Sequence, residues 1–425
     1  MRLKRIMLRY FPPGIGLEYI QGGCTKTKEI DLFDLTSSTD IEELAFAVAK
    51  GEPLITPNIH HQLVDSLRRL QKKIFSTTIH RFYRHKTLKT HLLPLTNVAF
   101  DKFGKKCLTG SYDRTCKVWD IETGEEVHTL QGHKNVVYAV AFNNPSGDKI
   151  LTGSFDKTAR LWSYETGECK QTFSGHSGEV VAVQFDPQKQ LIATASMDTT
   201  ARLYNSATGQ EVAVLQGHTG EIISLQYNSC GTHLLTGSFD HTVALWDTRT
   251  NSQLGVLAGH DAEISSCMFS QDGNVVVSGS LDKTARAWDV RTLKCLHCIE
   301  GHHDEVLDVT LDLRGWRLAT ASSDSTVRLW DLQNNCKLIS TLSGHTQEVS
   351  KVCFNPAGSI VLTASQDHTA RLWDPNSGKC LQLLEGHADD VFSCAFSYYG
   401  DTIITASKDN TCRIWHNTVT KKTDE

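Results

Sequence analysis

The sequence predicts an all-β fold, an eight-bladed β-propeller, with a small α+β domain in front of it. Eight histidines, from His91 to His387, follow one another at intervals of 42 or 43 residues. Between them, short stretches of alternating apolar residues are separated by turns rich in glycine, asparagine and aspartate. Residues 1–79 lack this repeat. Four short strands in a unit of about 42 residues are typical of one propeller blade.

The composition is that of an ordinary globular chain. Its 425 residues are 40% hydrophobic and 21% charged, which excludes a mostly disordered, collagen-like or coiled-coil protein. The longest apolar run, residues 136–142, is too short to cross a bilayer, so we expect no membrane association. Thirteen cysteines are scattered along the chain without a secretion signal, so we expect reduced thiols.

Charge is divided unevenly along the chain. Residues 1–90 hold 15 basic and 9 acidic residues, whereas the remainder holds 28 basic and 39 acidic residues. A basic segment attached to an acidic body can steer a partner of opposite charge. Alternatively, the two parts of the molecule attract each other and the asymmetry serves no external partner.

A second pattern lies inside each unit. Seven of the eight histidines follow a glycine, and Thr90 takes that place before His91. A tight turn carries an aspartate, such as Asp156, and five of the units end in Trp-Asp. The aromatic residues near the ends of the units are Trp119, Trp162, Tyr204, Trp246, Trp288, Trp330, Trp373 and Trp415. This period from Gly-His to Trp-Asp resembles the WD40 repeat family over residues 80–416.

The WD40 resemblance implies a structural role for the recurrent polar residues. In the second unit, His133 would bond to Asp156, and a hydroxyl of Thr152 or Ser154 would accept the indole N–H of Trp162. The equivalent residues singled out in other units are His176, Trp246 and Trp415. Repeated sets of histidine, aspartate and serine could suggest a hydrolase, but a catalyst needs one site. We therefore predict no catalytic residue.

The last unit lacks a fourth strand of its own, because only nine polar residues follow His416. A strand-like segment, residues 80–90, lies where an outer strand belongs. We predict that it pairs with the blade that ends at Trp415 and so removes two free sheet edges. The expected domains are an N-terminal α+β domain at 1–79, the propeller at 80–416 and a polar tail at 417–425.

The N-terminal segment predicts three strands and two helices. The strands are expected at 2–10, 15–20 and 27–35, with a turn at Pro12-Pro13-Gly14. Thr39 and Glu42 resemble a capping box for the first helix, and Pro57 suits the start of the second. The apolar stripe of the second helix is Ile59, Leu63, Val64, Leu67, Leu70 and Ile74. So small a unit is marginal alone, so we expect it to pack on the propeller or on a partner.

The second helix also has a basic face, formed by Arg68, Arg69, Lys72 and Lys73. Nucleic acid is one candidate ligand, but no aromatic residues alternate with these cations and the whole chain is acidic. We therefore expect a protein partner or the acidic propeller at this face, and no nucleic acid. A plain solvated face is the alternative interpretation.

Enzyme and cofactor motifs are absent from the sequence. There is no phosphate-binding loop, no Gly-x-Ser-x-Gly elbow and no His-Glu-x-x-His. Cys295 and Cys298 form a Cys-x-x-Cys pair, but residues three apart on a strand face opposite sides. We predict a protein without enzymatic activity, cofactor or metal.

One position differs between the units. The residue before the turn aspartate is expected on the face that carries the Gly-His loops. It is apolar in five units, as Tyr112, Phe155, Met197, Phe239 and Leu281, and polar in three, as Ser323, Gln366 and Lys408. Exposed apolar patches usually mark interfaces, so we predict partner binding at this apolar arc. Burial against the N-terminal domain is the alternative.

Trp316, on the opposite face, either packs locally or anchors a second partner.

Two charged positions recur as well. Carboxylates lie three residues after six of the histidines, at Glu179, Glu221, Glu263, Glu305, Glu348 and Asp390. Cations lie four residues after the turn aspartates, at Lys117, Arg160, Arg202, Arg286, Arg328, Arg371 and Arg413. We expect ion pairs near the central channel. An acidic rim that receives a basic partner is the alternative.

The start of the chain resembles that of one particular group of WD-repeat proteins. Residues 8–15, Leu-Arg-Tyr-Phe-Pro-Pro-Gly-Ile, the helical segment and the eight units together resemble the WD-repeat outer-arm dynein assembly factors of cilia. The resemblance implies a cargo adaptor that joins preassembled outer dynein arms to a B-complex subunit of the intraflagellar transport machinery, for import into cilia and flagella. It also implies a protein of the cytoplasm and the cilium, including the basal body.

Two separate surfaces would serve such an adaptor. One partner would use a groove between the basic N-terminal domain and the propeller, and the other would use a propeller face such as the apolar arc. We expect a monomer. Another kind of WD40 scaffold, such as a substrate receptor of a ubiquitin ligase or a chromatin reader, is the alternative, although residues 1–79 show no ligase-recruiting domain.

Overall fold

The computed structural model describes residues 2–9, 14–21, 24–32, 35, 39–55, 59–74, 81–89, 91–144, 146–188 and 190–417. Pro12, Pro13, Pro57, Thr90 and the tail at 418–425 lie outside these ranges. The chain divides into two compact units, Met1–His80 and Arg81–Glu425. No helix in the described part is both long and apolar enough to cross a bilayer.

A three-stranded antiparallel sheet opens the first unit. Its strands, in the order β1-β2-β3, are β1 (Arg2–Arg9), β2 (Gly14–Gln21) and β3 (Cys24–Asp31). The third strand spans 24–31 and not the predicted 27–35, because its pairing with β2 runs from Cys24, opposite Gln21, to Asp31, opposite Gly14. Lys4 and Arg5 on β1 bind the buried carboxylate of Glu18 on β2.

Two helices complete the first unit, α1 (Ile41–Gly51) and α2 (His60–Ile74). The N-cap of α1 is Asp40 and not the predicted Thr39, because Asp40 Oδ1 accepts the backbone N–H of Glu42 at 2.8 Å. The helix α2 packs against α1. Of its predicted apolar stripe, the fully buried members are Leu63, Val64, Leu67 and Leu70.

The second unit consists of eight four-stranded antiparallel sheets, the blades. Blades 1 to 4 are β5 (Leu95–Phe100), β6 (Lys106–Ser111), β7 (Thr115–Asp120) and β8 (Glu126–Gln131); β9 (Val137–Phe142), β10 (Lys149–Ser154), β11 (Ala159–Ser163) and β12 (Cys169–Phe173); β13 (Val180–Phe185), β14 (Leu191–Ser196), β15 (Ala201–Asn205) and β16 (Glu211–Leu215); and β17 (Ile222–Tyr227), β18 (His233–Ser238), β19 (Thr242–Asp247) and β20 (Ser252–Ala258). Blades 5 to 8 are β21 (Ile264–Phe269), β22 (Val275–Ser280), β23 (Ala285–Asp289) and β24 (Cys295–Ile299); β25 (Val306–Leu311), β26 (Arg317–Ser322), β27 (Val327–Asp331) and β28 (Lys337–Leu342); β29 (Val349–Phe354), β30 (Val361–Ser365), β31 (Ala370–Trp373) and β32 (Cys380–Leu384); and β33 (Val391–Phe396), β34 (Thr402–Ser407), β35 (Cys412–Asn417) and β4 (Phe82–Leu88).

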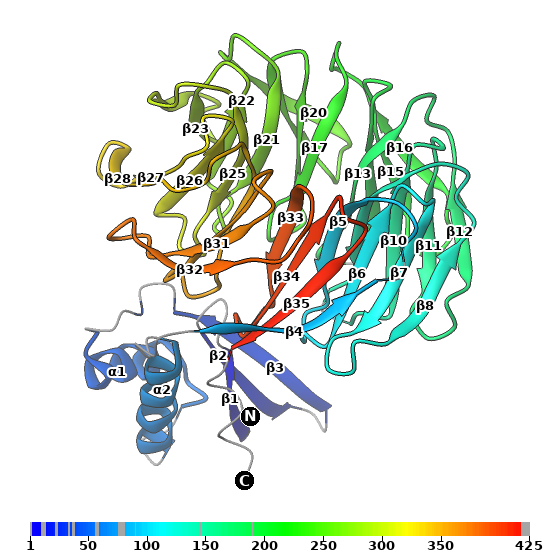
Figure 1. Cartoon of the computed structure of the whole chain (residues 1–425). Helices are drawn as coiled ribbons and strands as arrows, with labels where there is room; N and C mark the ends of the chain where they lie inside the picture. The colour runs from blue at the N-terminus through cyan, green and yellow to red at the C-terminus, as the bar shows by residue number, and fades with distance from the viewer. Residues whose placement is uncertain are drawn as a thin grey trace. The chain divides into compact units, whose positions relative to one another are not determined.

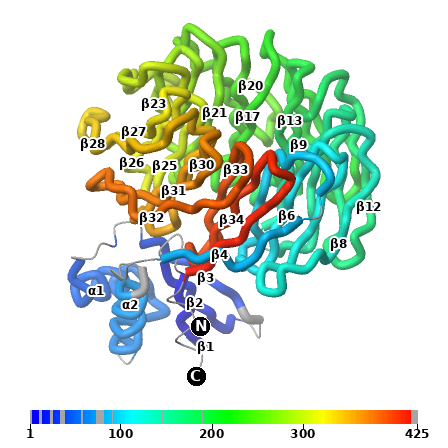
Figure 2. Tube along the Cα trace, in the orientation of Figure 1, coloured from blue at the N-terminus to red at the C-terminus, as the bar shows by residue number. Residues whose placement is uncertain are grey.

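The blades form a closed ring. The first strand of each blade contacts the first strand of the next, from β5 through to β33, and β33 contacts β5. Figures 1 and 2 show the blades following one another around the ring in chain order, from cyan to red. The eight-bladed propeller that the repeat predicts is therefore confirmed.

Apolar clusters fill the space between neighbouring blades. Each of the eight aromatic residues of the repeat belongs to a different cluster. Trp288 of blade 5, for example, packs with Leu235, Val243 and Leu257 of blade 4. A blade alone cannot cover its two apolar faces, so each blade is stable only between two neighbours.

Blade 8 takes its outer strand from the other end of the chain, as the sequence predicts. Strand β4 pairs antiparallel with β35, with Phe82 opposite Asn417 and Leu88 opposite Cys412. The last strand thus includes Asn417, one residue more than expected. This pairing covers an edge that would otherwise be free in each strand.

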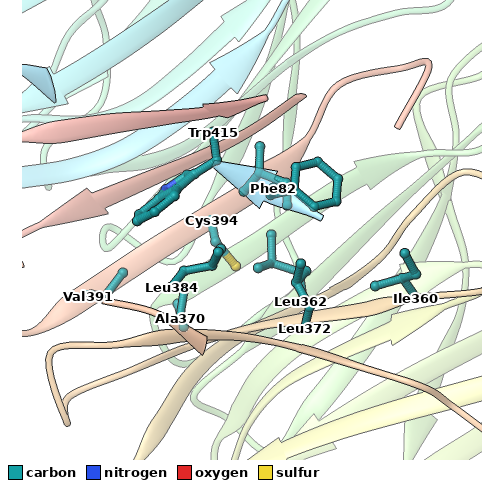
Figure 3. Close-up of a cluster of buried hydrophobic side chains, with 11 residues drawn as sticks. Phe82, Ile360, Leu362, Ala370, Leu372, Leu384, Val391, Cys394 and Trp415 are labelled. Atoms are coloured by element: carbon teal, nitrogen blue, oxygen red, sulfur yellow. The ribbon is translucent and has the colours of Figure 1, made fainter. Parts of the chain in front are cut away.

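The two ends of β4 pack on opposite faces of blade 8. Phe82 lies in the cluster that blade 7 and blade 8 share, together with Leu372 and Trp415 (Figure 3). Leu88 lies in the cluster that blades 8 and 1 share, together with Leu95. One short strand therefore ties three consecutive blades together.

Candidate interaction surfaces

A chain of hydrogen bonds crosses each blade between its second and third strands. In blade 2, Trp162 Nε1 donates to Thr152 Oγ1 at 2.9 Å, and the same oxygen lies 2.8 Å from His133 Nε2. His133 Nδ1 in turn lies 2.8 Å from Asp156 Oδ2. The hydroxyl is therefore that of Thr152. The alternative, Ser154, accepts the backbone N–H of Asp156 at 3.1 Å instead.

The other blades repeat this arrangement with small variations. Trp246 and Trp415 donate to the threonine of their own blade at 2.8 Å and 3.1 Å. In blade 3 the hydroxyl of Tyr204 donates to the carbonyl of Ser174 at 3.4 Å, while His176 keeps its contacts with threonine and aspartate. The network is thus a property of the repeat and not of one blade.

The electrostatics of the network follow from burial. Burial lowers the pKa of His176 despite the opposing effect of Asp198, so the imidazole is neutral, donates through Nδ1 and accepts at Nε2. Burial alone would raise the pKa of Asp198, but hydrogen bonds from Thr200, from the backbone of Ser177 and from His176 hold that pKa at about 2. Because both nitrogens of this buried ring are occupied by fixed partners, we assign the histidines a structural role.

The glycine of the Gly-His motif permits a close approach. Gly344 has a φ of +156°, and a Cβ there would lie 2.7 Å from Arg371 Nη1 and 3.2 Å from Trp373. The cation of the third strand therefore lies over the tryptophan, as Arg371 does over Trp373. A third-strand cation that has a carboxylate partner finds it on the fourth strand of its blade, as Arg202 does with Glu211. In the described part of the chain, no ion pair joins these cations to the carboxylates that follow the histidines, so the predicted pairing is wrong.

The residues of the apolar arc lie beside the Gly-His loops, on what we call the Gly-His face. The backbone N–H of Phe155 bonds to the carbonyl of Val136 at 3.0 Å, and equivalent bonds anchor the other blades. Tyr112, Met197 and Phe239 are 43%, 37% and 38% exposed, and Phe155 and Leu281 are half-buried. Five adjacent blades thus present apolar side chains on one face.

Three further exposed apolar residues flank the arc in blades 1 and 2. Leu92 and Leu93 are 82% and 47% exposed. Tyr138 stacks on Phe155 with the ring centroids 5.3 Å apart. Sequence reasoning missed all three. The signal for the leucines was the departure of the first unit from Gly-His, whereas Tyr138 resembled any other strand residue.

The carboxylates that follow the histidines border the same face. In blades 7 and 8 the chain itself engages them: Gln366 Nε2 donates to Glu348 Oε2 at 2.7 Å, and Lys408 Nζ lies 3.2 Å from Asp390 Oδ2. Among the described residues, no ion pair reaches the equivalent carboxylates of blades 3 to 6, Glu179, Glu221, Glu263 and Glu305.

The basic face of α2 is smaller than the sequence predicts. Arg68 Nη2 lies 2.6 Å from Glu42 Oε1 of α1, so this cation is neutralised inside the first unit. Arg69 and Lys72 are exposed, and no ion pair of the described residues involves them. The side chain of Lys73 lies outside the described part.

Trp316 packs locally. The Arg314 guanidinium carbon lies 5.1 Å from the centre of its ring, and the indole is half-buried.

Cys295 and Cys298 are both exposed free thiols. The described residues contain no group of three histidine, cysteine, aspartate or glutamate side chains that could hold a metal ion.

The family model for the WD domain, G-beta repeat, matches almost the whole second unit. The matched segments are 82–120, 124–163, 167–205, 209–247, 251–289, 293–331, 336–374 and 378–416. The chain belongs to the WD40 repeat family.

Beyond the WD40 repeat, part of the chain is similar to curated proteins of one name. It is 57% identical over 148 residues to "Dynein assembly factor with WD repeat domains 1" of Xenopus laevis and of Mus musculus. The Homo sapiens protein of that name is 55% identical over the same length. Each match covers 35% of this chain and 36% of the relative, so the match spans about a third of those relatives.

A solved structure shares the WD40 fold. The computationally designed protein Ika8 superposes with a TM-score of 0.70 over 78% of this chain and 98% of that protein, at 28% identity.

Proposed function

We propose that this protein is a non-enzymatic adaptor in the assembly of axonemal dynein. In this role it links preassembled outer dynein arms to the intraflagellar transport machinery, through a subunit of the transport B complex. It then works as a monomer in the cytoplasm and in the cilium or flagellum, including the basal body.

The observation that carries the proposal is the identity of 55–57% to proteins named as dynein assembly factors. A shared fold alone goes with a much lower sequence identity, since the designed protein Ika8, which has a similar fold, is 28% identical to this chain. The identity over these 148 residues therefore favours a role shared with those relatives.

The two units offer separate candidate surfaces for two partners. On the propeller, the apolar arc of Tyr112, Phe155, Met197, Phe239 and Leu281 is a surface of the kind that proteins bury on binding. On the first unit, the exposed cations Arg69 and Lys72 of α2 suit an acidic partner.

Affinity purification of the full chain from ciliated cells tests the proposal. We expect dynein chains and transport subunits to be recovered together. Recovery of ubiquitin-ligase or chromatin proteins in their place would favour another class of WD40 scaffold and overturn the proposal.

Two variants assign the surfaces in the same experiment. Met197→Gln with Phe239→Gln should release one partner, and Arg69→Glu with Lys72→Glu should release the other. Matched controls are Leu254→Gln, an equally exposed apolar residue on outer strand β20, and Lys26→Glu, an exposed cation on β3. If the paired variants retain both partners while still folded, these surfaces are not the binding sites.

A further inference from the structure

Three adjacent blades repeat one pairing of unlike side chains on the Gly-His face. In blades 3, 4 and 5 an apolar residue of the arc lies beside a glutamate of the preceding loop, and its backbone N–H bonds to the glutamate carbonyl at 2.9 Å. The pairs are Met197 with Glu179, Phe239 with Glu221 and Leu281 with Glu263. We call these the apolar–acidic pairs.

Among the residues that the structure describes, no ion pair includes the carboxylates of these three pairs. Lys283, in the turn of blade 5, reaches the carbonyl of His303 and the carboxylate of Asp304 in the next blade instead. Three negative charges therefore stand uncompensated next to partly exposed apolar surface. A solvated carboxylate alone needs no partner, but apolar surface at its side favours burial.

Blade 8 shows what fits this position. There, Lys408 replaces the apolar residue, and its ammonium group lies 3.2 Å from Asp390 and 3.8 Å from Asp389. In blade 7, Gln366 satisfies Glu348 in the same way. The chain thus occupies its own acidic position in two blades and leaves it open in blades 3, 4 and 5.

A lysine or arginine side chain matches an apolar–acidic pair in both of its parts. Its methylene stem can cover the methionine, phenylalanine or leucine while its charged head reaches the carboxylate. Over Phe239 the cation gains a further attraction to the face of the ring. An acidic peptide or a nucleic acid would meet repulsion at all three glutamates.

We propose that blades 3 to 5 bind a basic segment of a protein partner, with one lysine or arginine side chain on each apolar–acidic pair. Blades 1 and 2 lack the glutamate, since Pro94 and Val136 stand in its place, and they expose Leu92 and Tyr138. The apolar part of the same segment lies there. This inference rests on the proposed role of the apolar arc and adds the chemistry of what the arc binds.

The test uses the full chain and a fluorescein-labelled amphipathic helical peptide of 18 leucine and lysine residues. Fluorescence anisotropy measures its dissociation constant at low and high salt. We expect saturable binding that weakens with salt, and no binding of a peptide with glutamate in place of lysine. The combined variant Glu179→Gln, Glu221→Gln and Glu263→Gln should weaken binding by about tenfold, the sum of three partly exposed ion pairs.

A matched variant separates this site from general attraction to an acidic protein. Glu348→Gln with Asp390→Asn removes carboxylates of the same face that the chain already occupies. It should leave the dissociation constant within about twofold. Ser323→Leu, beside Glu305, completes a fourth pair in blade 6 and should strengthen binding. Thermal unfolding confirms that each variant folds.

The proposal is overturned if the triple glutamine variant binds as the unchanged protein does, or if the matched variant loses as much affinity. Equal binding of the glutamate peptide would also overturn it. Since neither peptide contains dynein or transport sequences, these outcomes are independent of the purification from ciliated cells. A basic-segment site can therefore stand or fall without deciding the adaptor role.

Discussion

At the scale of single residues, one hydroxyl in each blade decides how the buried polar groups are satisfied. Thr152 Oγ1 accepts from the indole of Trp162 and lies 2.8 Å from His133 Nε2, so one atom joins two rings of one blade. All three side chains are nearly excluded from solvent. A polar group left unpaired there would lower the free energy of unfolding by about 1–3 kcal/mol, so the three side chains of this network depend on one another.

A tryptophan of the hydrogen-bonded network, such as Trp246, should be far more sensitive to truncation than Trp316, which lies outside the network. We expect Trp246→Ala to lower the free energy of unfolding by about 3–5 kcal/mol, through the cavity between blades and the lost indole bond. Trp316→Ala is the control, since that half-buried ring packs on Arg314 and should cost less than about 2 kcal/mol. Urea unfolding followed by circular dichroism measures both, and equal losses would contradict the assignment.

Sequence spacing predicted the ring well and the loops and surfaces less well, for a physical reason. The period of 42 or 43 residues repeats the same local structure eight times, so a unit that differs from the other seven is easily recognised. The N-cap at Asp40 depends on one turn and carries no such redundancy. The pairing of Arg68 with Glu42 joins two helices whose contact no local pattern shows. Exposure of Leu92 and Tyr138 likewise depends on tertiary packing.

At the scale of elements, the closing strand has an anchor outside its own blade. The side-chain amide of Gln382, on outer strand β32 of blade 7, accepts the backbone N–H of Phe82 at 2.9 Å and donates to the carbonyl of Phe82. The equivalent Gln171 of blade 2 donates to the carbonyl of Ala207 in a loop of the next blade. Blade 8 has no such continuous loop at that place, so Gln382 holds the start of β4 instead.

Removal of this amide should loosen the closing strand selectively. We expect Gln382→Ala to lower the free energy of unfolding by about 1–3 kcal/mol and to speed amide exchange in residues 82–88 and 412–417 before other blades respond. Hydrogen exchange measured by mass spectrometry resolves these segments. Gln171→Ala is the matched control and should leave exchange in β4 unchanged. Uniform acceleration across all blades would show that Gln382 is not a specific anchor.

At the scale of the whole molecule, eight copies of one buried network make the response to acid a collective property. Burial lowers the pKa of His176, His260, His302 and His387 below the ordinary value of 6.5, against the effect of their aspartates. These histidines take up protons more readily once the chain unfolds. Their contribution to stability is therefore complete above pH 6.5 and declines as the pH falls below that value.

The aspartates act in the same direction at lower pH. Although burial opposes it, hydrogen bonds from the network hold the pKa of Asp198 and Asp324 at about 2, below their ordinary value of 3.8. Their stabilisation is present above pH 3.8 and is lost as the pH falls towards 2. Asp186 and Asp312, whose pKa burial raises, act in the opposite direction, but they are fewer than the network groups.

We therefore expect the free energy of unfolding to fall in two stages, first below about pH 6.5 and again below about pH 4. Because every blade needs its neighbours, the ring should lose stability as one cooperative unit and not blade by blade. Denaturant unfolding at a series of pH values measures the profile. Asp198→Asn removes one titrating carboxylate, so it should lower stability at neutral pH and make the second stage shallower. A stability that stays level from pH 7 to pH 3 would mean that the network is not held by these charges.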